Sequence, residues 1–197
     1  MNQRRNTRDR LVDAAGSAFS ELGFRGASTR EIAARANVNQ GLITYHFKTK
    51  DELWRAAADR VFSMLRTRLG ERVASLESKD PATFAREAIR EYVRFAAAHP
   101  ELFRMMVAEG QGSGDRIHWL VETHLRPLYE DIFLQFIGTV GPGADESLLP
   151  HAYYVLAGAG SLMFAIAPEC RLLTGVDPEA PRAVEVHAEF VARLLVP

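Results

Sequence analysis

The sequence predicts an all-α protein, and three features of its 197 residues support this prediction. Apolar residues recur at the three- and four-residue spacing of a helix in almost every segment. No segment of the sequence alternates apolar and polar residues for long enough to indicate a strand. Capping residues, glycines and prolines mark the ends of the periodic segments, so we expect about nine helices. These form an N-terminal three-helix unit and a larger C-terminal helical unit.

The first helix is predicted over residues 7–22. We expect Thr7 to cap its N-terminus and Gly23 to end it, because glycine commonly follows a helix C-terminus. One apolar stripe at helical spacing would face the core, and it comprises Leu11, Ala14, Ala15, Ala18, Phe19 and Leu22.

The second helix is predicted over residues 29–36, because Ser28 and Glu31 occupy the two positions of a capping box. In such a box the serine caps the helix and the glutamate side chain reaches back to the cap residue. Residues 37–39, "NVN", would form the turn that follows, since asparagine tolerates the left-handed conformation and caps helices well. The residues that this helix would bury are Ile32, Ala33 and Ala36.

The third helix is predicted within "QGLITYHF", residues 40–47, although this stretch contains several residues that strands favour. At about 100° per residue, Ile43 and Phe47 fall on one side of the helix. Gly41, Thr44 and Tyr45 fall on the other side. A strand here would have no partner strand, so a helix is the better interpretation. Its weak helical propensity indicates that the outward residues serve something other than stability.

The fourth helix begins at a second capping box, Thr49 to Glu52. Its inward residues would be Leu53, Ala57, Val61, Met64 and Leu65. Asp80 and Pro81 open the next helix, which ends at His99 and Pro100. The remaining helices are predicted over residues 101–109, 115–137, 146–167 and 179–195, and the glycine-rich stretches "EGQGSGD" and "GTVGPGAD" separate three of them.

Charge is distributed unevenly along the chain. Residues 1–50 carry nine Arg and Lys against four Asp and Glu, or +5, whereas the rest carries 15 against 21, or −6. A basic N-terminal unit favours a polyanionic partner. Four arginines lie before or at the start of the first helix: Arg4, Arg5, Arg8 and Arg10. They would form either an arm that reaches a DNA minor groove or a solvated tail.

Two short capped helices joined by a three-residue turn have the geometry of a helix-turn-helix, whose second helix enters the major groove of DNA. Thr44 and Tyr45 would offer hydroxyls to phosphates or base edges, and Gly41 would permit close approach. Lys48 and Lys50 flank the start of the fourth helix, whose free N–H groups favour a phosphate. The alternative is an ordinary helical hairpin with an exposed tyrosine and some lysines.

The stretch "STREIAARANVNQGLITYHFKTKDEL" resembles the DNA-binding signature of the TetR family of transcriptional regulators, of the TetR/AcrR type. The resemblance implies a DNA-binding domain over residues 5–65, with its helix-turn-helix motif at 28–47. The positions that it assigns to DNA, together with Arg30 beside the same groove, are Gln40, Gly41, Thr44, Tyr45, His46, Lys48 and Lys50. Thr44 departs from the family pattern, because many members carry an aromatic residue there. The operator sequence therefore does not follow from the resemblance.

Residues 66–197 resemble the family only in being helical, and what the resemblance implies for them is a ligand-binding and dimerisation domain. The last two helices are strongly apolar, and the small residues 157–161 would let them approach a second copy closely in a homodimer. A core helix of a monomer is the alternative. Large adaptable side chains would line a pocket for an apolar or aromatic molecule, although they also fill cores. The candidates are Phe95, Phe103, Met106, Trp119, Tyr129, Phe133, Tyr153 and Met163.

The function that follows from the resemblance is a DNA-binding regulator, by default a repressor that a small ligand releases from a palindromic operator. The alternatives are a helical protein-interaction module without DNA binding and a ligand-responsive activator. We expect no enzyme activity and no cofactor, because no nucleophile motif is present and Cys170 has no recognisable partner. Asp115, His118 and Glu122, with His124 nearby, have a spacing that suits a metal sensor, but such residues more often form a solvated face.

The segment "LLPHAYYVLAGAGSLMFAIAP", residues 148–168, approaches the length of a membrane span, which is about 20 apolar residues. Prolines bound it and His151, Ser161 and two glycines interrupt it, so we expect a buried helix and no membrane. The N-terminal "MNQRRNTRDR" is polar and basic, which argues against a signal peptide. A single Cys170 fits a reducing compartment, and we expect the cytoplasm.

Overall fold

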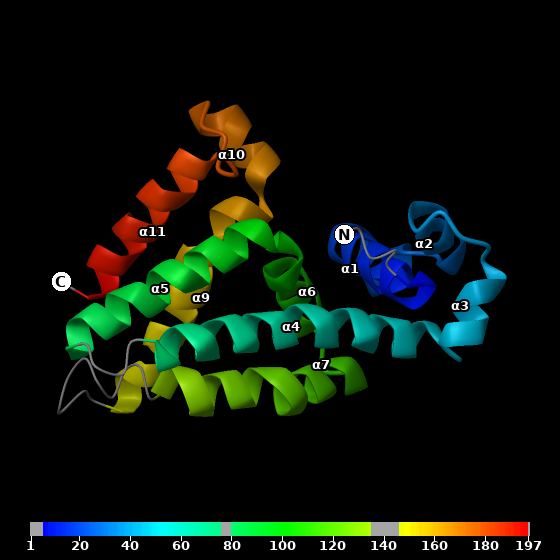
Figure 1. Ribbon diagram of the computed structural model, residues 1–197, viewed down its shortest axis with the longest axis horizontal. Coiled ribbons are helices and arrows are strands. Elements are labelled where there is room, and N and C mark those ends of the chain that lie inside the picture. The colour runs from blue at the N-terminus through cyan, green and yellow to red at the C-terminus, as the bar shows by residue number, and fades with distance from the viewer. Residues whose placement is uncertain (1–5, 76–79, 135–145, 197) are drawn as a thin grey trace.

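A computed structural model describes residues 6–75, 80–134 and 146–196 (Figure 1). These ranges contain ten α-helices and no strand, which confirms the all-α prediction. The helices are α1 Thr7–Gly26, α2 Thr29–Arg35, α3 Gly41–His46, α4 Lys50–Ala74, α5 Pro81–Ala98, α6 Pro100–Gly110, α7 Asp115–Leu120, α9 Leu149–Ala165, α10 Ala167–Thr174 and α11 Pro181–Leu195. We call α1–α3 the head and α4–α11 the body.

The first helix starts and ends differently from the prediction. Its N-cap is Asn6, whose side chain accepts the N–H of Arg8, so the prediction of Thr7 as the cap is wrong. Gly23, which was predicted to end the helix, kinks it with φ 68°, and the chain then continues helically to Gly26. This kink stacks Phe24 on Phe19, with ring centroids 5.8 Å apart. Leu22 is left 43% exposed at the edge of the stripe, contrary to the prediction.

Local caps shape the two helices that follow. The Ser28 hydroxyl accepts the N–H of Glu31 at 3.1 Å, while the Glu31 carboxylate pairs with Arg35 on the next turn. Asn37 has a left-handed φ of 52°, so the turn at residues 37–39 lies where it was predicted. The Asn39 side chain accepts the N–H of Gly41 at 2.8 Å, which starts α3.

Helix α4, the first helix of the body, starts against the head and extends along the body (Figure 1). Its start is fixed on both sides, because Thr49 accepts the N–H of Glu52 at 3.0 Å and the Glu52 carboxylate accepts the N–H of Lys48 at 3.0 Å. Four of its five predicted inward residues are buried, but Met64 is 42% exposed. The reason is a change of packing partner, since the body-facing half of α4 buries a rotated face: Phe62, Leu65 and Leu69.

The predicted helix at 115–137 is α7 followed by two π-helical segments, Val121–Leu125 and Leu128–Phe133. Residues 135–137 and the "GTVGPGAD" stretch lie outside the described residues. The predicted helix at 146–167 begins with a 3-10 turn, Glu146–Leu148, and is broken at Ile166. Helix α10, which the periodicity did not predict, starts there with Pro168 in its first turn, where proline opens a helix.

Two hydrophobic cores hold the helices together. The first joins head and body without interruption, from Leu11 and Ile32 in the head through Trp54 on α4 to Leu102 and Leu120. The second lies between α5, α9 and α11, around Ile89, Val93, Phe164, Ala188 and Val191. The predicted division at residues 65 and 66 therefore falls within a continuous helix, beside a core that both parts share.

Part of the small-residue stretch of α9 packs inside the chain, whereas Gly158 faces open space. A Cβ added at Gly160 would stand 2.7 Å from Cε1 of Tyr92 on α5. The Ser161 hydroxyl lies 2.8 Å from the Tyr92 hydroxyl, and His187 of α11 bonds the Ala159 carbonyl at 2.7 Å. Ala159, Gly160 and Ser161 thus help to hold α5, α9 and α11 together, and the contact expected between two copies stays a prediction.

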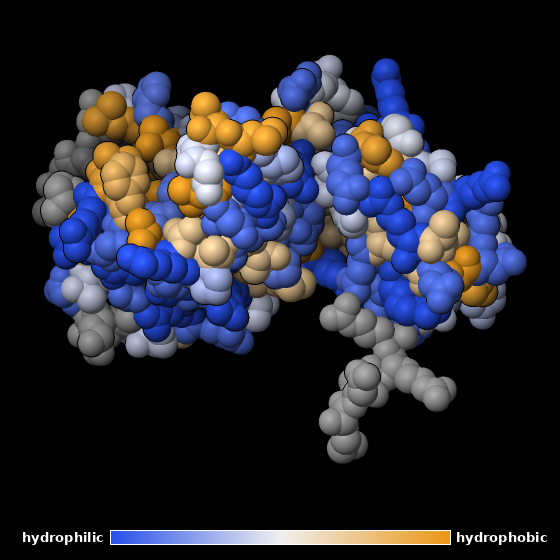
Figure 2. Space-filling view, turned by 90° about the horizontal axis from the view of Figure 1, so that it is seen from above, coloured by the Kyte–Doolittle hydropathy of each residue, from blue (hydrophilic) through white to orange (hydrophobic). Residues whose placement is uncertain are grey.

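The outer side of α9 and α11 is apolar and uncovered. Hydrophobic residues gather along one edge of the body in Figure 2. On α9 and α11 the large exposed apolar side chains are Tyr154, Val155, Leu162, Val186, Phe190 and Leu194, and we call this set the apolar face. Among the described helices, Glu146–Ala165 has the length and composition of a membrane span, with only 28% of that window buried. The expected buried helix is thus buried on one side only.

Candidate functional site

The outward face of α3 is exposed, as its periodicity predicts. Ile43 and Phe47 are 3% and 4% exposed and hold the helix to the core of the head. Tyr45 is 80% exposed, and Thr44 lies beside it in solvent. The Tyr45 ring stands edge-on to that of the half-buried His46, with centroids 4.9 Å apart. Because most of the Tyr45 side chain is exposed, it is available to a partner.

The start of α3 is more constrained than its sequence suggests. The Gln40 side-chain amide donates to the Thr29 hydroxyl at 3.1 Å, which ties the recognition end of α3 to α2. A Cβ added at Gly41 would lie 3.1 Å from Oδ1 of Asn39. Glycine at this position therefore leaves room for the Asn39 cap as well as for close approach of a ligand.

The basic residues proposed for phosphate differ in their surroundings. Lys48 and Arg30 are exposed, on the α3–α4 connection and in the first turn of α2. The Lys50 ammonium instead lies 4.7 Å from the ring centroid of Phe24. Burial, aided by the nearby Arg116 guanidinium, lowers the pKa of Lys50. Lys48 is thus the better placed of the two lysines for a phosphate contact.

The head is fastened to the body by charged side chains around α4. Arg60 bonds Asp9 and Asp13 of α1, at 2.5 Å each. Arg116, at the start of α7, lies 3.7 Å from the Phe24 ring centroid and bonds Glu109 at 3.1 Å. Helices α4 and α7 therefore contact the head through charged side chains.

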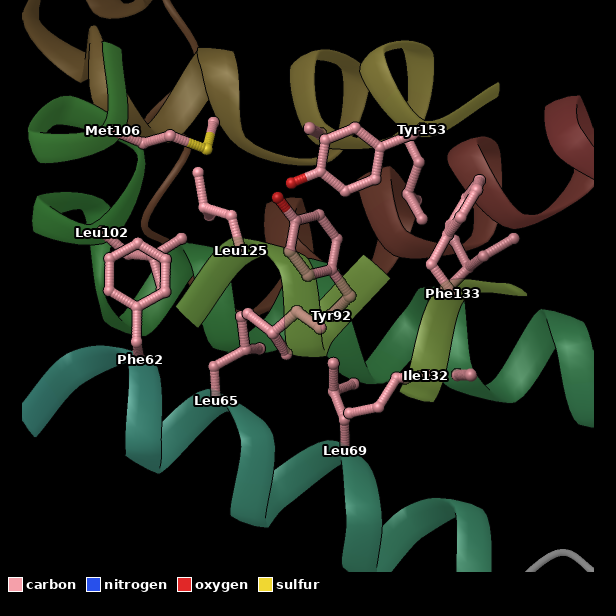
Figure 3. A pocket seen from close by; sticks show the side chains of 15 residues that line it. Phe62, Leu65, Leu69, Tyr92, Leu102, Met106, Leu125, Ile132, Phe133 and Tyr153 are labelled. Carbon is pink, nitrogen blue, oxygen red and sulfur yellow. The ribbon is translucent and has the colours of Figure 1, made fainter. Parts of the chain in front are cut away.

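A cavity lies in the body between α4, α5, α6, the π-helical segments and α9 (Figure 3). Together with the part that opens to solvent, it encloses about 670 Å³ of space. Its walls are almost wholly apolar. The lining residues are Phe62, Leu65, Leu69, Ala88, Ile89, Tyr92, Leu102, Met106, Leu125, Leu128, Ile132, Phe133, Tyr153, Leu156 and Ala157.

Of the eight pocket candidates, the cavity brings together Met106, Phe133 and Tyr153. Tyr129 lies behind this wall, stacked on Phe133 with centroids 5.3 Å apart. Trp119 packs on Trp54 at 5.8 Å. The other candidates lie in the cores or on α6: Phe95, Phe103 and Met163. Tyr92 and the aliphatic lining could not be recognised from the sequence, because leucines that face a cavity have the same spacing as leucines that fill a core.

His124 occupies a buried position beside the cavity, on the first π-helical segment. Its Nε2 lies 2.9 Å from a carboxylate oxygen of Asp59 on α4. Its ring is stacked on Phe62 and meets Trp119 edge-on, with centroid distances of 5.1 and 5.2 Å. Glu122, another residue of the metal-sensor pattern, pairs with Arg126. Within the described ranges, no three His, Cys, Asp or Glu side chains lie together as a metal site.

We expect His124 to make the stability of the protein depend on pH. Burial lowers its pKa from 6.5, although Asp59 opposes the shift. The unfolded chain then binds a proton that the folded chain does not, so the free energy of unfolding should fall as the pH drops below about 6.5. In His124→Asn this component should disappear, whereas in His118→Asn, which removes an exposed histidine nearby, it should remain. Urea unfolding across this pH range measures both, and equal slopes in the two variants would contradict the assignment.

The sequence matches a known protein family and individual known proteins. Residues 11–57 match the family model described as "Bacterial regulatory proteins, tetR family". The chain is 30% identical over 191 residues to the HTH-type transcriptional repressor Rv3405c of Mycobacterium tuberculosis, covering 95% of this chain and 88% of that protein. It is 25% identical over 157 residues to the HTH-type transcriptional repressor NicS of Pseudomonas putida, covering 77% of this chain and 72% of that protein.

Solved structures share the fold. A transcriptional regulator from Rhodococcus sp. Rha1 aligns with a TM-score of 0.70 at 22% identity, covering 96% of each chain. The fatty acid degradation regulator FadR from Bacillus halodurans aligns with a TM-score of 0.67 at 17% identity, covering 99% of this chain and 97% of that one. At these identities the likeness shows a shared fold, and the coverage shows that it includes both the head and the body.

Proposed function

Because the chain belongs to the TetR family of DNA-binding transcriptional regulators, we propose that it is a repressor that a small apolar molecule releases from a palindromic operator. The observation that carries the DNA part is the exposure of Tyr45 and Thr44 on α3, while Ile43 and Phe47 hold that helix in the core. In the proposed complex α3 lies in the major groove. The contacts assigned to DNA are Arg30, Gln40, Gly41, Thr44, Tyr45, His46, Lys48 and, more weakly, Lys50.

A homodimer would place two copies of α3 in successive major grooves, about 34–36 Å apart. The apolar face of α9 and α11 supports this arrangement, because exposed apolar side chains in one contiguous area favour association. A twofold interface would use the same face on both copies, and a palindromic operator would match that symmetry. The proposed domain division follows: DNA binding by residues 5–65, and ligand binding and dimerisation by residues 66–197.

The cavity supports control by a ligand. Leu102 and Met106 of α6 line it, and Met105 between them belongs to the core that joins body and head. Leu65 and Leu69 of α4 line it as well, and α4 carries the Arg60 bonds to α1. A ligand that binds one arrangement of α4 and α6 better than another would shift the spacing of the two α3 helices, and only that difference in affinity can release DNA.

The test is a footprint of the purified protein on its own upstream DNA. We expect a protected palindrome whose affinity falls steeply with salt. Lys48→Ala should reduce the slope of log K against log salt by about 2 per dimer, since each lost phosphate contact removes about 0.9. Arg126→Ala, on the body, should leave the slope unchanged. A protein that binds no duplex at low salt would instead be a helical interaction module.

A further inference from the structure

The cavity contains a polar pair in an otherwise apolar wall. Of its fifteen lining residues only Tyr92 and Tyr153 carry a side-chain hydroxyl, and none is charged. Tyr92 comes from α5 and Tyr153 from α9. Figure 3 shows their two hydroxyls pointing toward each other. A ligand that fills the cavity therefore meets both hydroxyls at one place.

The two hydroxyls have different partners. Tyr92 shares a hydrogen bond of 2.8 Å with Ser161, which is only 1% exposed. Among the described residues, Tyr153 has ring contacts with Tyr129, Phe133 and Tyr154 and no hydrogen bond. Burial raises the pKa of Tyr92 to about 12, and burial with neighbouring tyrosines raises the pKa of Tyr153 to about 12. Both phenols are consequently neutral at physiological pH, and Tyr153 has a proton to donate.

None of the described residues that line the cavity is charged, and three arginines of the helices around it have partners within the chain. Arg68 pairs with the buried Glu91, which also faces Arg94 at 3.8 Å. Arg104 of α6 donates to the Ala165 carbonyl at 2.7 Å. A carboxylate in the cavity would lose its hydration and gain no cation, which is strongly unfavourable. An uncharged oxygen acceptor would lose less hydration free energy than a carboxylate, and it would accept a hydrogen bond from Tyr153.

We propose that the ligand of this cavity is an uncharged apolar molecule with one carbonyl oxygen, which accepts a hydrogen bond from Tyr153 beside the Tyr92–Ser161 pair. The proposal rests on the proposed ligand-controlled function and specifies the class of its ligand. A ketone or ester of medium chain length fits, whereas the corresponding free carboxylate does not. The protonated acid is uncharged and binds in proportion to its population.

Three probes of similar length test the proposal on the full-length protein without DNA: 2-nonanone, octanoate and nonane, by calorimetric titration. Near pH 7 we expect the ketone to bind at least about tenfold more tightly than octanoate. Ketone affinity should not change with pH, while octanoate affinity should weaken about tenfold per unit rise, because only the protonated acid binds. Tyr153→Phe should weaken the affinity for the ketone by about 2- to 10-fold and leave the affinity for nonane unchanged.

Tyr129→Phe is the matched control, since it removes the same atom from a ring just outside the cavity, and ketone affinity should be unaltered. Octanoate that binds as tightly as the ketone with no dependence on pH would overturn the proposal. So would a ketone affinity that Tyr153→Phe does not change, or the failure of all three probes to bind. These failures leave DNA binding intact, whereas failure of the proposed function appears as loss of the footprint in protein that still binds the ketone.

Discussion

Phe190→Glu is expected to dissociate the proposed dimer. Phe190 is 63% exposed near the centre of α11, one turn from Val186 and from Leu194, and α11 packs against α9. A twofold interface brings two copies of the substituted residue into the same apolar contact, where each carboxylate would lose water without gaining a partner. The dissociation constant of the dimer should rise by at least about 100-fold, which is about 3 kcal/mol.

Sedimentation equilibrium of the wild-type and substituted proteins measures this change. Operator affinity should fall with dimerisation, because a single α3 helix reads only half of a palindrome. Val107→Glu introduces the same charge on α6 at a position that is 42% exposed and lies outside the apolar face. It should leave the dimer unchanged. A Phe190→Glu protein that remains dimeric at micromolar concentration would place the interface elsewhere.

The second large effect is expected for Trp54→Ala. Trp54 is 1% exposed and lies where α4 leaves the head, against Trp119 and within 5.8 Å of the Arg116 guanidinium. Removing a buried tryptophan costs about 3–5 kcal/mol, because the surroundings collapse only partly into the space. Since Trp54 belongs to the core that joins head and body, both should lose stability in one shared transition.

Urea unfolding at a fixed protein concentration checks this prediction, with circular dichroism reporting all helices and fluorescence of the remaining Trp119 reporting the body. Tyr45→Ala serves as the control, because that side chain is 80% exposed and should change stability little. Two separate transitions in the wild-type protein, with only one of them shifted by Trp54→Ala, would show that head and body unfold independently.

Most features that depend on near neighbours were predictable from the sequence, although the cap of α1 is Asn6 and not Thr7. The caps at Ser28, Asn39, Thr49 and Asp80 each act within three residues of their own position. The left-handed Asn37 is equally local. The two faces of α3 follow from helical spacing alone, so the amino-acid sequence is sufficient to predict which side of this helix is exposed.

Features that depend on distant partners were not predictable. Met64 has the spacing of an inward residue, but α4 changes its buried face where it passes from head to body. The sequence favours Pro168 as the end of a helix, although proline is equally common in a first turn, where the structure has it. Tyr92 becomes notable only because α9 brings Ser161 to it across 69 positions of the chain. The cavity exists because the side chains around it do not fill the space between them. The spacing of apolar residues along the sequence does not reveal such a gap.

The core that joins head and body also sets a rule for engineering. Regulators of this kind invite chimaeras, in which the DNA specificity of one protein is grafted onto the ligand response of another. A graft joined at residue 65 would keep α4 continuous and still place a foreign α1 against the native α6, around Leu102 and Met105. Such a protein would still bind the ligand, but ligand binding would no longer change its affinity for the operator. Exchanging the α6 surface together with the head would preserve that linkage.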